Sequence, residues 1–97
     1  MNSDTSLLDK VREAVAQSLR IPPAQIDPNT RFIAELSAES IDLVDIEGEL
    51  ESMTGCEVDL RGMVEERNTR QGTDYADFTV QEVVDYLAWK IQPAEAH

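Results

Sequence analysis

Hydrophobic residues recur at the spacing of an α-helix near the start of the chain. The recurring positions are Leu7, Leu8, Val11, Ala14, Val15 and Leu19. Asp9, Lys10 and Glu13 fall on the opposite side of a helix drawn through these positions. Pro22 and Pro23 end the pattern, because proline lacks an N–H and restricts the residue before it. The pattern therefore predicts an amphipathic helix that begins near Leu7 and ends before Pro22.

A long connection, residues 21–39, follows this helix. It contains the turn sequence Asp27-Pro28-Asn29-Thr30, which is typical of a loop. It also contains four large apolar residues, which are Ile26, Phe32, Ile33 and Leu36. A structureless loop of this length is uncommon in a compact domain unless it is functional. We expect the apolar residues to anchor the loop to the core.

A second helix is predicted from Ser40 to Met53, with Gly55 as a left-handed stop. One stripe of this helix can face a core and contains Leu43, Ile46, Leu50 and Met53. A second apolar strip, called here the outward strip, lies nearly opposite and consists of Ile41, Val44 and Gly48. The carboxylates that border it are Asp42, Asp45, Glu47, Glu49 and Glu51. The outward strip either docks a partner or packs under the preceding loop, and the spacing leaves both open.

The rest of the chain predicts two more helices of unequal length. Val58, Leu60, Met63 and Val64 supply a short third helix, and residues 69–77 form a polar loop. Thr79 and Glu82 form a capping box, so the last helix begins near Val80, and Pro93 marks its end. Its predicted buried face contains Val80, Val83, Val84, Leu87 and Ile91. The fold class is all-α: a small antiparallel bundle of three main helices plus a short third one, in a single domain over residues 1–97 with a core of about 7–91.

The charge of the chain narrows the classes of partner. Eight Lys and Arg residues stand against 20 Asp and Glu residues, which gives a net charge of −12. This charge repels nucleic acid and anionic lipid, and it favours basic protein patches or serves solubility alone. No apolar run approaches the length of a membrane span, and the first residues lack a signal-peptide pattern. We expect a cytoplasmic monomer that neither binds nucleic acid nor inserts into a membrane.

Catalytic and metal chemistry have few candidate residues. Cys56 is the only cysteine, so the sequence offers neither an intrachain disulfide nor a zinc motif. His97 is the only histidine and is the last residue, a poor place for the base of a nucleophile pair. The acidic residues lack the spacing of a calcium-binding EF-hand loop. We expect no catalytic residues and no metal.

Ser40 is the candidate functional residue. A serine at the start of a helix usually satisfies only free N–H groups. Ser40, however, follows the long anchored loop and opens the helix that carries the outward strip. It also stands in a stretch, residues 32–60, that contains no Lys or Arg. We expect its hydroxyl to be accessible to a basic partner.

The residues around Ser40 resemble the acyl carrier protein family. Residues 32–42, FIAELSAESID, are similar to the family pattern F-x-x-[DE]-L-G-x-D-S-L-[DE], and residues 79–87 are similar to its last helix. The resemblance implies that a phosphopantetheinyl transferase attaches 4′-phosphopantetheine covalently to Ser40. It implies a carrier of acyl thioesters for fatty-acid, specialised-lipid or polyketide biosynthesis, and a cosubstrate of other enzymes. It also implies that acyl-transferring and condensing enzymes dock, through basic patches, on Glu39, Ile41, Val44, Asp45, Gly48 and Glu51.

The sequence departs from the family pattern at several positions. Ser37 stands where glycine is common, Glu39 and Ile41 replace Asp and Leu, and Gly48 stands where a large apolar residue is frequent. The segment from Arg61 to Asp77 is longer than in the commonest carriers, as in carriers for specialised lipids, and residues 40–46 resemble a run in carriers of very long acyl chains.

Two alternatives stay open. The chain can be an unmodified acidic module that uses the helix from Ser40 to bind a protein partner. Independently, the interior lined by Leu43, Ile46, Leu50 and the valines of the last helix either shelters an acyl chain or is a fully packed core.

Overall fold

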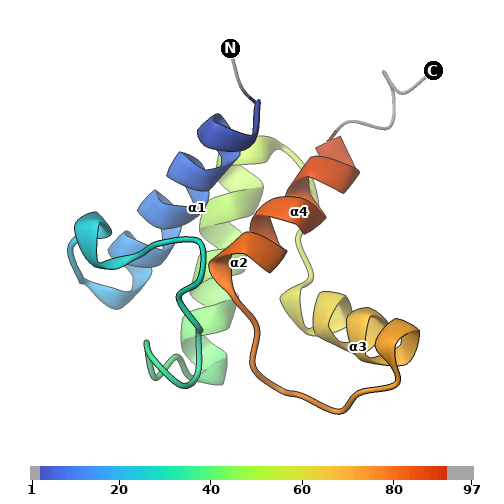
Figure 1. The fold of residues 1–97 in the computed structure, drawn as a ribbon. Coiled ribbons are helices and arrows are strands. Elements are labelled where there is room, and N and C mark those ends of the chain that lie inside the picture. Colours follow the sequence, from blue (N-terminus) through green and yellow to red (C-terminus); the bar gives the residue numbers. More distant parts are fainter. Residues whose placement is uncertain (1–2, 92–97) are drawn as a thin grey trace.

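The structure is a computed structural model that describes residues 3–91, with side chains described from residue 7 (Figure 1). The elements are α1 (Ser3–Leu19), a short 3-10 turn (Pro23–Gln25), α2 (Ser40–Thr54), α3 (Leu60–Gln71) and α4 (Val80–Ile91). The predicted all-α class is confirmed, and α1 begins one turn earlier than predicted. Pro93 and His97 lie outside the described residues.

The core forms where α1 packs against both α2 and α4. Figure 1 shows α2 running antiparallel to α1, with the long loop passing close to the start of α4. The buried apolar residues are Leu7, Val11, Ala14, Val15, Ala16, Ile26, Phe32, Ile46, Leu50, Val58, Leu60, Phe78, Val80, Val83, Val84 and Leu87. The predicted inward faces of α1 and α2 are thus confirmed, with Leu43 and Met53 packed at the edge of the core.

The third helix is longer than the sequence indicates. The prediction of a short helix was wrong, because α3 has 12 residues, as many as α4, and it includes positions 69–71 that were assigned to a loop. Asp59 starts it by accepting a hydrogen bond from the N–H of Gly62 at 2.9 Å. Gly72, with φ of 67°, ends it in the left-handed conformation. These caps define a helix whose apolar pattern is weak.

α3 is also the helix least integrated into the bundle. Figure 1 shows it to the side of α4, and it makes few close backbone contacts with the other helices. Leu60 is buried, but Met63 and Val64 are only partly buried. Most of the remaining positions of α3 are polar.

Two apolar residues do not lie where the pattern predicted. Ile33, expected to anchor the loop, is 42% exposed, and Ile91, expected on the buried face of α4, is 41% exposed. Phe32 takes the inward position in the loop by stacking on Phe78, with ring centroids 4.4 Å apart, so its neighbour faces outward. Ile91 is the last residue of α4, where the buried face of that helix ends. Across residues 3–91, none of the helices has the length and apolar character needed to cross a membrane.

The weak packing of α3 predicts a gradient of local stability. Amide hydrogens in α3 should exchange faster than those in the middle of α1, α2 and α4, because little apolar surface holds α3 to the bundle. Hydrogen exchange followed by NMR measures this directly. Equal protection of α3 and α2 would contradict the description of α3 as weakly attached.

Candidate functional site

Ser40 is exposed at the first position of α2. The residue before it, Glu39, is extended and is the N-cap. The carboxylate of Asp42 accepts a hydrogen bond from the N–H of Glu39 at 2.9 Å. This is one of the hydrogen bonds of a capping box, in which Glu39 and Asp42 cap the helix. Ser40 follows the N-cap at the first helical position, and its exposure leaves the hydroxyl available for chemistry at the surface.

The outward strip of α2 is accessible in the structure. Ile41 is 67% exposed and Val44 is 62% exposed, so the alternative in which they pack under the preceding loop is wrong. Gly48 is exposed too, and a side chain there would meet nothing within 4 Å. Packing therefore does not require glycine at this position. The outward strip therefore has two exposed aliphatic side chains, Ile41 and Val44, and no side chain at Gly48.

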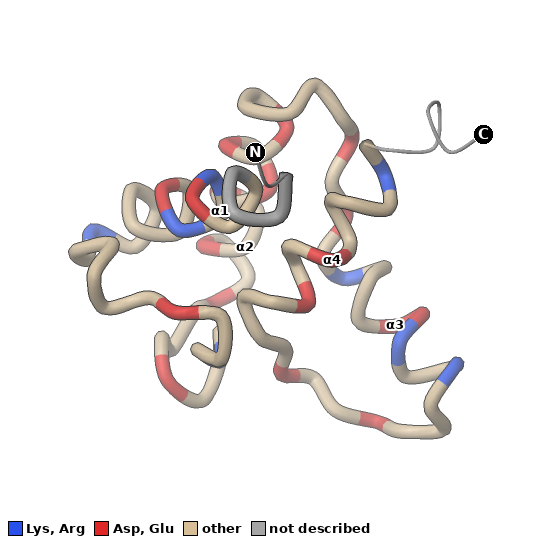
Figure 2. The backbone as a smooth tube through the Cα atoms, turned by 45° about the horizontal axis from the view of Figure 1, so that its top comes forward, with Lys and Arg blue, Asp and Glu red and all other residues tan. Residues whose placement is uncertain are grey.

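Figure 2 marks the acidic residues along the backbone, and those on α2 and at its N-cap differ in their contacts. Asp45 and Glu39 are exposed. Glu51, which is also exposed, accepts a hydrogen bond from the N–H of Val58 at 3.0 Å, and Glu47, which is partly buried, accepts one from the N–H of Leu60 at 2.8 Å. These two carboxylates hold the connection that leads into α3. Glu51, which the resemblance assigned to docking, therefore also has a structural role.

The loop that leads to Ser40 ends in a compact turn. The N–H of Leu36 donates to the carbonyl of Arg31 at 3.1 Å, and the N–H of Ser37 donates to the carbonyl of Ile33 at 3.2 Å. Ser37 has φ of 55°, in the left-handed region. This region costs a residue with a Cβ roughly 1–2 kcal/mol, which explains why the family pattern favours glycine there.

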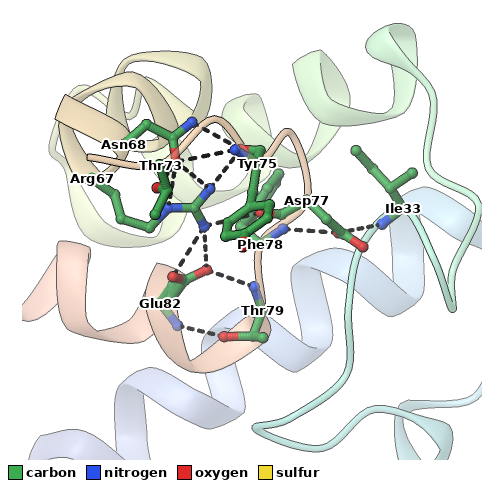
Figure 3. Close-up of polar contacts among 9 residues, drawn as sticks. All are labelled: Ile33, Arg67, Asn68, Thr73, Tyr75, Asp77, Phe78, Thr79 and Glu82. Atoms are coloured by element: carbon green, nitrogen blue, oxygen red, sulfur yellow. Dashed lines mark hydrogen bonds and ion pairs between the residues drawn. The ribbon is translucent and has the colours of Figure 1, made fainter. Parts of the chain in front are cut away.

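Asp77, which lies more than forty residues later in the chain, caps this turn (Figure 3). One carboxylate oxygen accepts hydrogen bonds from the N–H groups of Ile33 and Phe78, both at 2.8 Å, and the other accepts from Ala34 at 2.9 Å. Burial of the carboxylate acts to raise its pKa. The three N–H groups and the nearby charge of Arg31 outweigh that effect and lower the pKa of Asp77 below its ordinary value of 3.8.

Arg67 is a functional candidate that the sequence analysis missed. It is only 8% exposed, and its guanidinium donates to the carbonyls of Tyr75 and Asp77 at 2.6 and 2.9 Å. It also pairs with the carboxylate of Glu82 at 3.0 Å. A signal was present in the sequence, because Arg67 lies two turns after Leu60 on the same face of α3, where an apolar residue is expected.

Two hollows lie beside α3. One hollow of about 430 Å³ lies between α3 and α4, and another of about 560 Å³ extends toward α2. Met63, Tyr86 and Trp89 line both, while neither is lined by the α2 stripe that the sequence analysis placed around an interior acyl site. Ile46 and Leu50 are completely buried. The interior is a packed core in this structure.

The described residues contain no metal site to test further. In residues 3–91, no group of three or more His, Cys, Asp or Glu side chains is arranged to hold a metal ion. Cys56 is partly buried, and its thiol donates to the carbonyl of Thr54 at 3.8 Å.

The hydrogen bonds of Asp77 predict an acid-dependent stability. Because its pKa is lower in the folded chain, ionised Asp77 stabilises the fold above pH 3.8, and this contribution is lost as the pH falls through the folded pKa. At neutral pH, Asp77→Asn should lower the free energy of unfolding by about 1–3 kcal/mol. The difference from wild type should stay constant down to about pH 5 and shrink below the unfolded pKa. Urea unfolding across this range tests it, and a difference that does not change with pH would contradict it.

Comparison with known proteins identifies the family of this chain. A family model described as the phosphopantetheine attachment site matches residues 9–76. Acyl carrier protein 2 of Ralstonia nicotianae is 34% identical over 53 residues, which cover 55% of this chain and 65% of that protein, less than two thirds of its length.

Two further relatives match over most of their length. The acyl carrier protein of Cyanidioschyzon merolae is 32% identical over 85 residues, 88% of this chain and 81% of that protein. The acyl carrier protein of Rubrobacter xylanophilus is 31% identical over 81 residues, 84% of this chain and 86% of that protein. Since the family model covers most of the chain, including Ser40, and these relatives align along nearly all of it, the chain belongs to the phosphopantetheine-binding family of acyl carrier proteins.

Proposed function

We propose that this protein is an acyl carrier whose 4′-phosphopantetheine arm is attached to Ser40. The observation that carries the proposal is an exposed serine at the first position of α2, directly after a helix cap that is formed by Glu39 and Asp42. The attached group supplies a terminal thiol that carries acyl groups as thioesters. The chain itself acts as a cosubstrate and contributes no catalytic residue.

The start of α2 suits a phosphodiester on Ser40. The first turn of an α-helix leaves backbone N–H groups without intrahelical partners, and the helix dipole places partial positive charge there. Both effects favour a phosphate at this position. They offset the negative charges of Glu39 and Asp42 beside it.

The outward strip is the proposed docking surface. Ile41 and Val44 offer apolar contact next to Ser40, and Asp45 and Glu39 offer exposed negative charge. A phosphopantetheinyl transferase, and enzymes that transfer or condense acyl groups, would meet this surface with a basic patch around an apolar groove. Fatty-acid, specialised-lipid or polyketide biosynthesis, in the cytoplasm, is the setting that we propose for this carrier.

Replacement of Ser40 tests the proposal. A phosphopantetheinyl transferase with coenzyme A should add one prosthetic group to wild type and none to Ser40→Ala, as read by intact mass. Ser52→Ala, which removes an exposed serine from the same helix, is the matched control and should be modified like wild type. Modification of Ser40→Ala, or none of wild type, would overturn the proposal, and the second result would favour an unmodified interaction module.

A charge reversal on α2 tests the docking surface. Asp45→Lys should slow association with the transferase and weaken its dependence on salt, because Asp45 is an exposed charge beside the outward strip. Val44→Ala should mainly speed dissociation, because it removes apolar contact. Stopped-flow binding at low and high salt measures both effects.

The control for this experiment is Glu13→Lys on α1, which changes the net charge by the same amount on another helix. Circular dichroism checks that each variant is folded. Glu51 is left unchanged, because its carboxylate holds Val58. If Asp45→Lys and Glu13→Lys associate equally fast at low salt, the charge beside the outward strip does not steer docking.

A further inference from the structure

The turn before Ser40 contains backbone N–H groups that its own sequence cannot satisfy. Residues 31–37 close into a turn, and the N–H groups of Ile33 and Ala34 stand at its beginning, as do those of the first turn of a helix. A side chain 43–44 residues later, Asp77, accepts both hydrogen bonds. The carboxylate of Asp77 therefore caps the turn from a segment that is distant in the sequence.

The backbone on either side of this cap also joins the two segments. The N–H of Phe32 donates to the carbonyl of Phe78 at 3.0 Å, and the two rings stack. The N–H of Val80 donates to the carbonyl of Thr30 at 3.0 Å. After the turn, the N–H of Ala38 donates to the carbonyl of Phe32 at 3.0 Å. Ala38 lies two residues before Ser40. The direction in which the chain enters α2 thus depends on the start of α4.

Asp77 is itself held in place from α3 (Figure 3). Its carbonyl accepts a hydrogen bond from Arg67, and the same guanidinium binds Tyr75 and Glu82. Glu82 also accepts the N–H of Thr79 at 2.9 Å, in the capping box of α4. A lysine could not make these contacts together, because it lacks the planar fork of arginine.

We propose that Asp77, oriented by Arg67, is a positioning residue for the modification of Ser40: it fixes the turn of residues 31–37 and with it the placement of the Ser40 hydroxyl on a docked transferase. This inference rests on the proposed function. It gives the extended segment from Arg61 to Asp77 a role, which is to supply both the cap and the arginine that orients it.

Loss of the positioning by Asp77 should change the kinetics of modification differently from loss of docking contacts. The outward strip on α2 is not part of the Asp77 contacts, so binding of the carrier should change little when Asp77 is altered. A displaced hydroxyl should instead lower kcat, because misplacement of a reacting group by about 1 Å can cost up to about a hundredfold in rate. Val44→Ala should show the opposite split, a raised KM with nearly unchanged kcat.

The experiment measures kcat and KM of a phosphopantetheinyl transferase for the full-length chain and its variants. Asp77→Ala should lower kcat about tenfold or more, and Asp77→Asn should lower it less, because its amide oxygen still accepts. Arg67→Lys should also lower kcat. Asp74→Asn, an exposed carboxylate in the same connection, is the matched control and should behave like wild type.

Foldedness and the state of the turn are measured beside the kinetics. All rates are compared at a temperature at which circular dichroism shows each variant folded, with the isosteric Asp77→Asn as the deciding variant if Asp77→Ala unfolds. Amide exchange at Ile33 and Ala34 should accelerate in the Asp77 variants. Folded Asp77 variants with wild-type kcat would overturn the inference alone, whereas an unmodified wild type would overturn the proposed function.

Discussion

The hydrogen bonds and the ring stacking that join the long loop to the start of α4 are the constraint on which the placement of Ser40 depends. Residues 21–39 contain little regular structure, so their backbone groups need partners elsewhere. Residues 77–80 supply several of them, and the stacked rings of Phe32 and Phe78 cover this junction with apolar surface. Without these contacts, a serine at the end of a loop of this length would have no fixed orientation toward a partner. Here it begins a helix whose entry direction is set.

Carboxylates do two kinds of work in this acidic chain. Asp45 is exposed on α2 and is available to a partner. Glu47, Glu51 and Asp77 accept hydrogen bonds from backbone N–H groups of the connections between helices. Arg67 donates hydrogen bonds to backbone carbonyls of the α3–α4 connection. The chain thus stabilises its loops with charge-assisted hydrogen bonds where its small core cannot reach.

The sequence predicted those parts in which local pattern and packing agree. The stripe of α1, the capping box at Thr79 and the exposed start of α2 at Ser40 all follow from spacing that the structure preserves. The extent of α3 could not be predicted from an apolar stripe, because a buried arginine occupies the expected apolar position. The cap by Asp77 was also hidden, since it joins residues more than forty positions apart. Such contacts depend on the tertiary arrangement and leave no periodic signal.

We propose that Ser40, and no other serine, carries the prosthetic group. Trypsin should release residues 32–61 from the modified protein as one peptide, because Arg31 and Arg61 enclose a stretch without Lys or Arg. That peptide contains Ser37, Ser40 and Ser52. Fragmentation in a mass spectrometer should place the phosphopantetheine on Ser40. A modification located on Ser37 or Ser52, or on another peptide, would contradict the account.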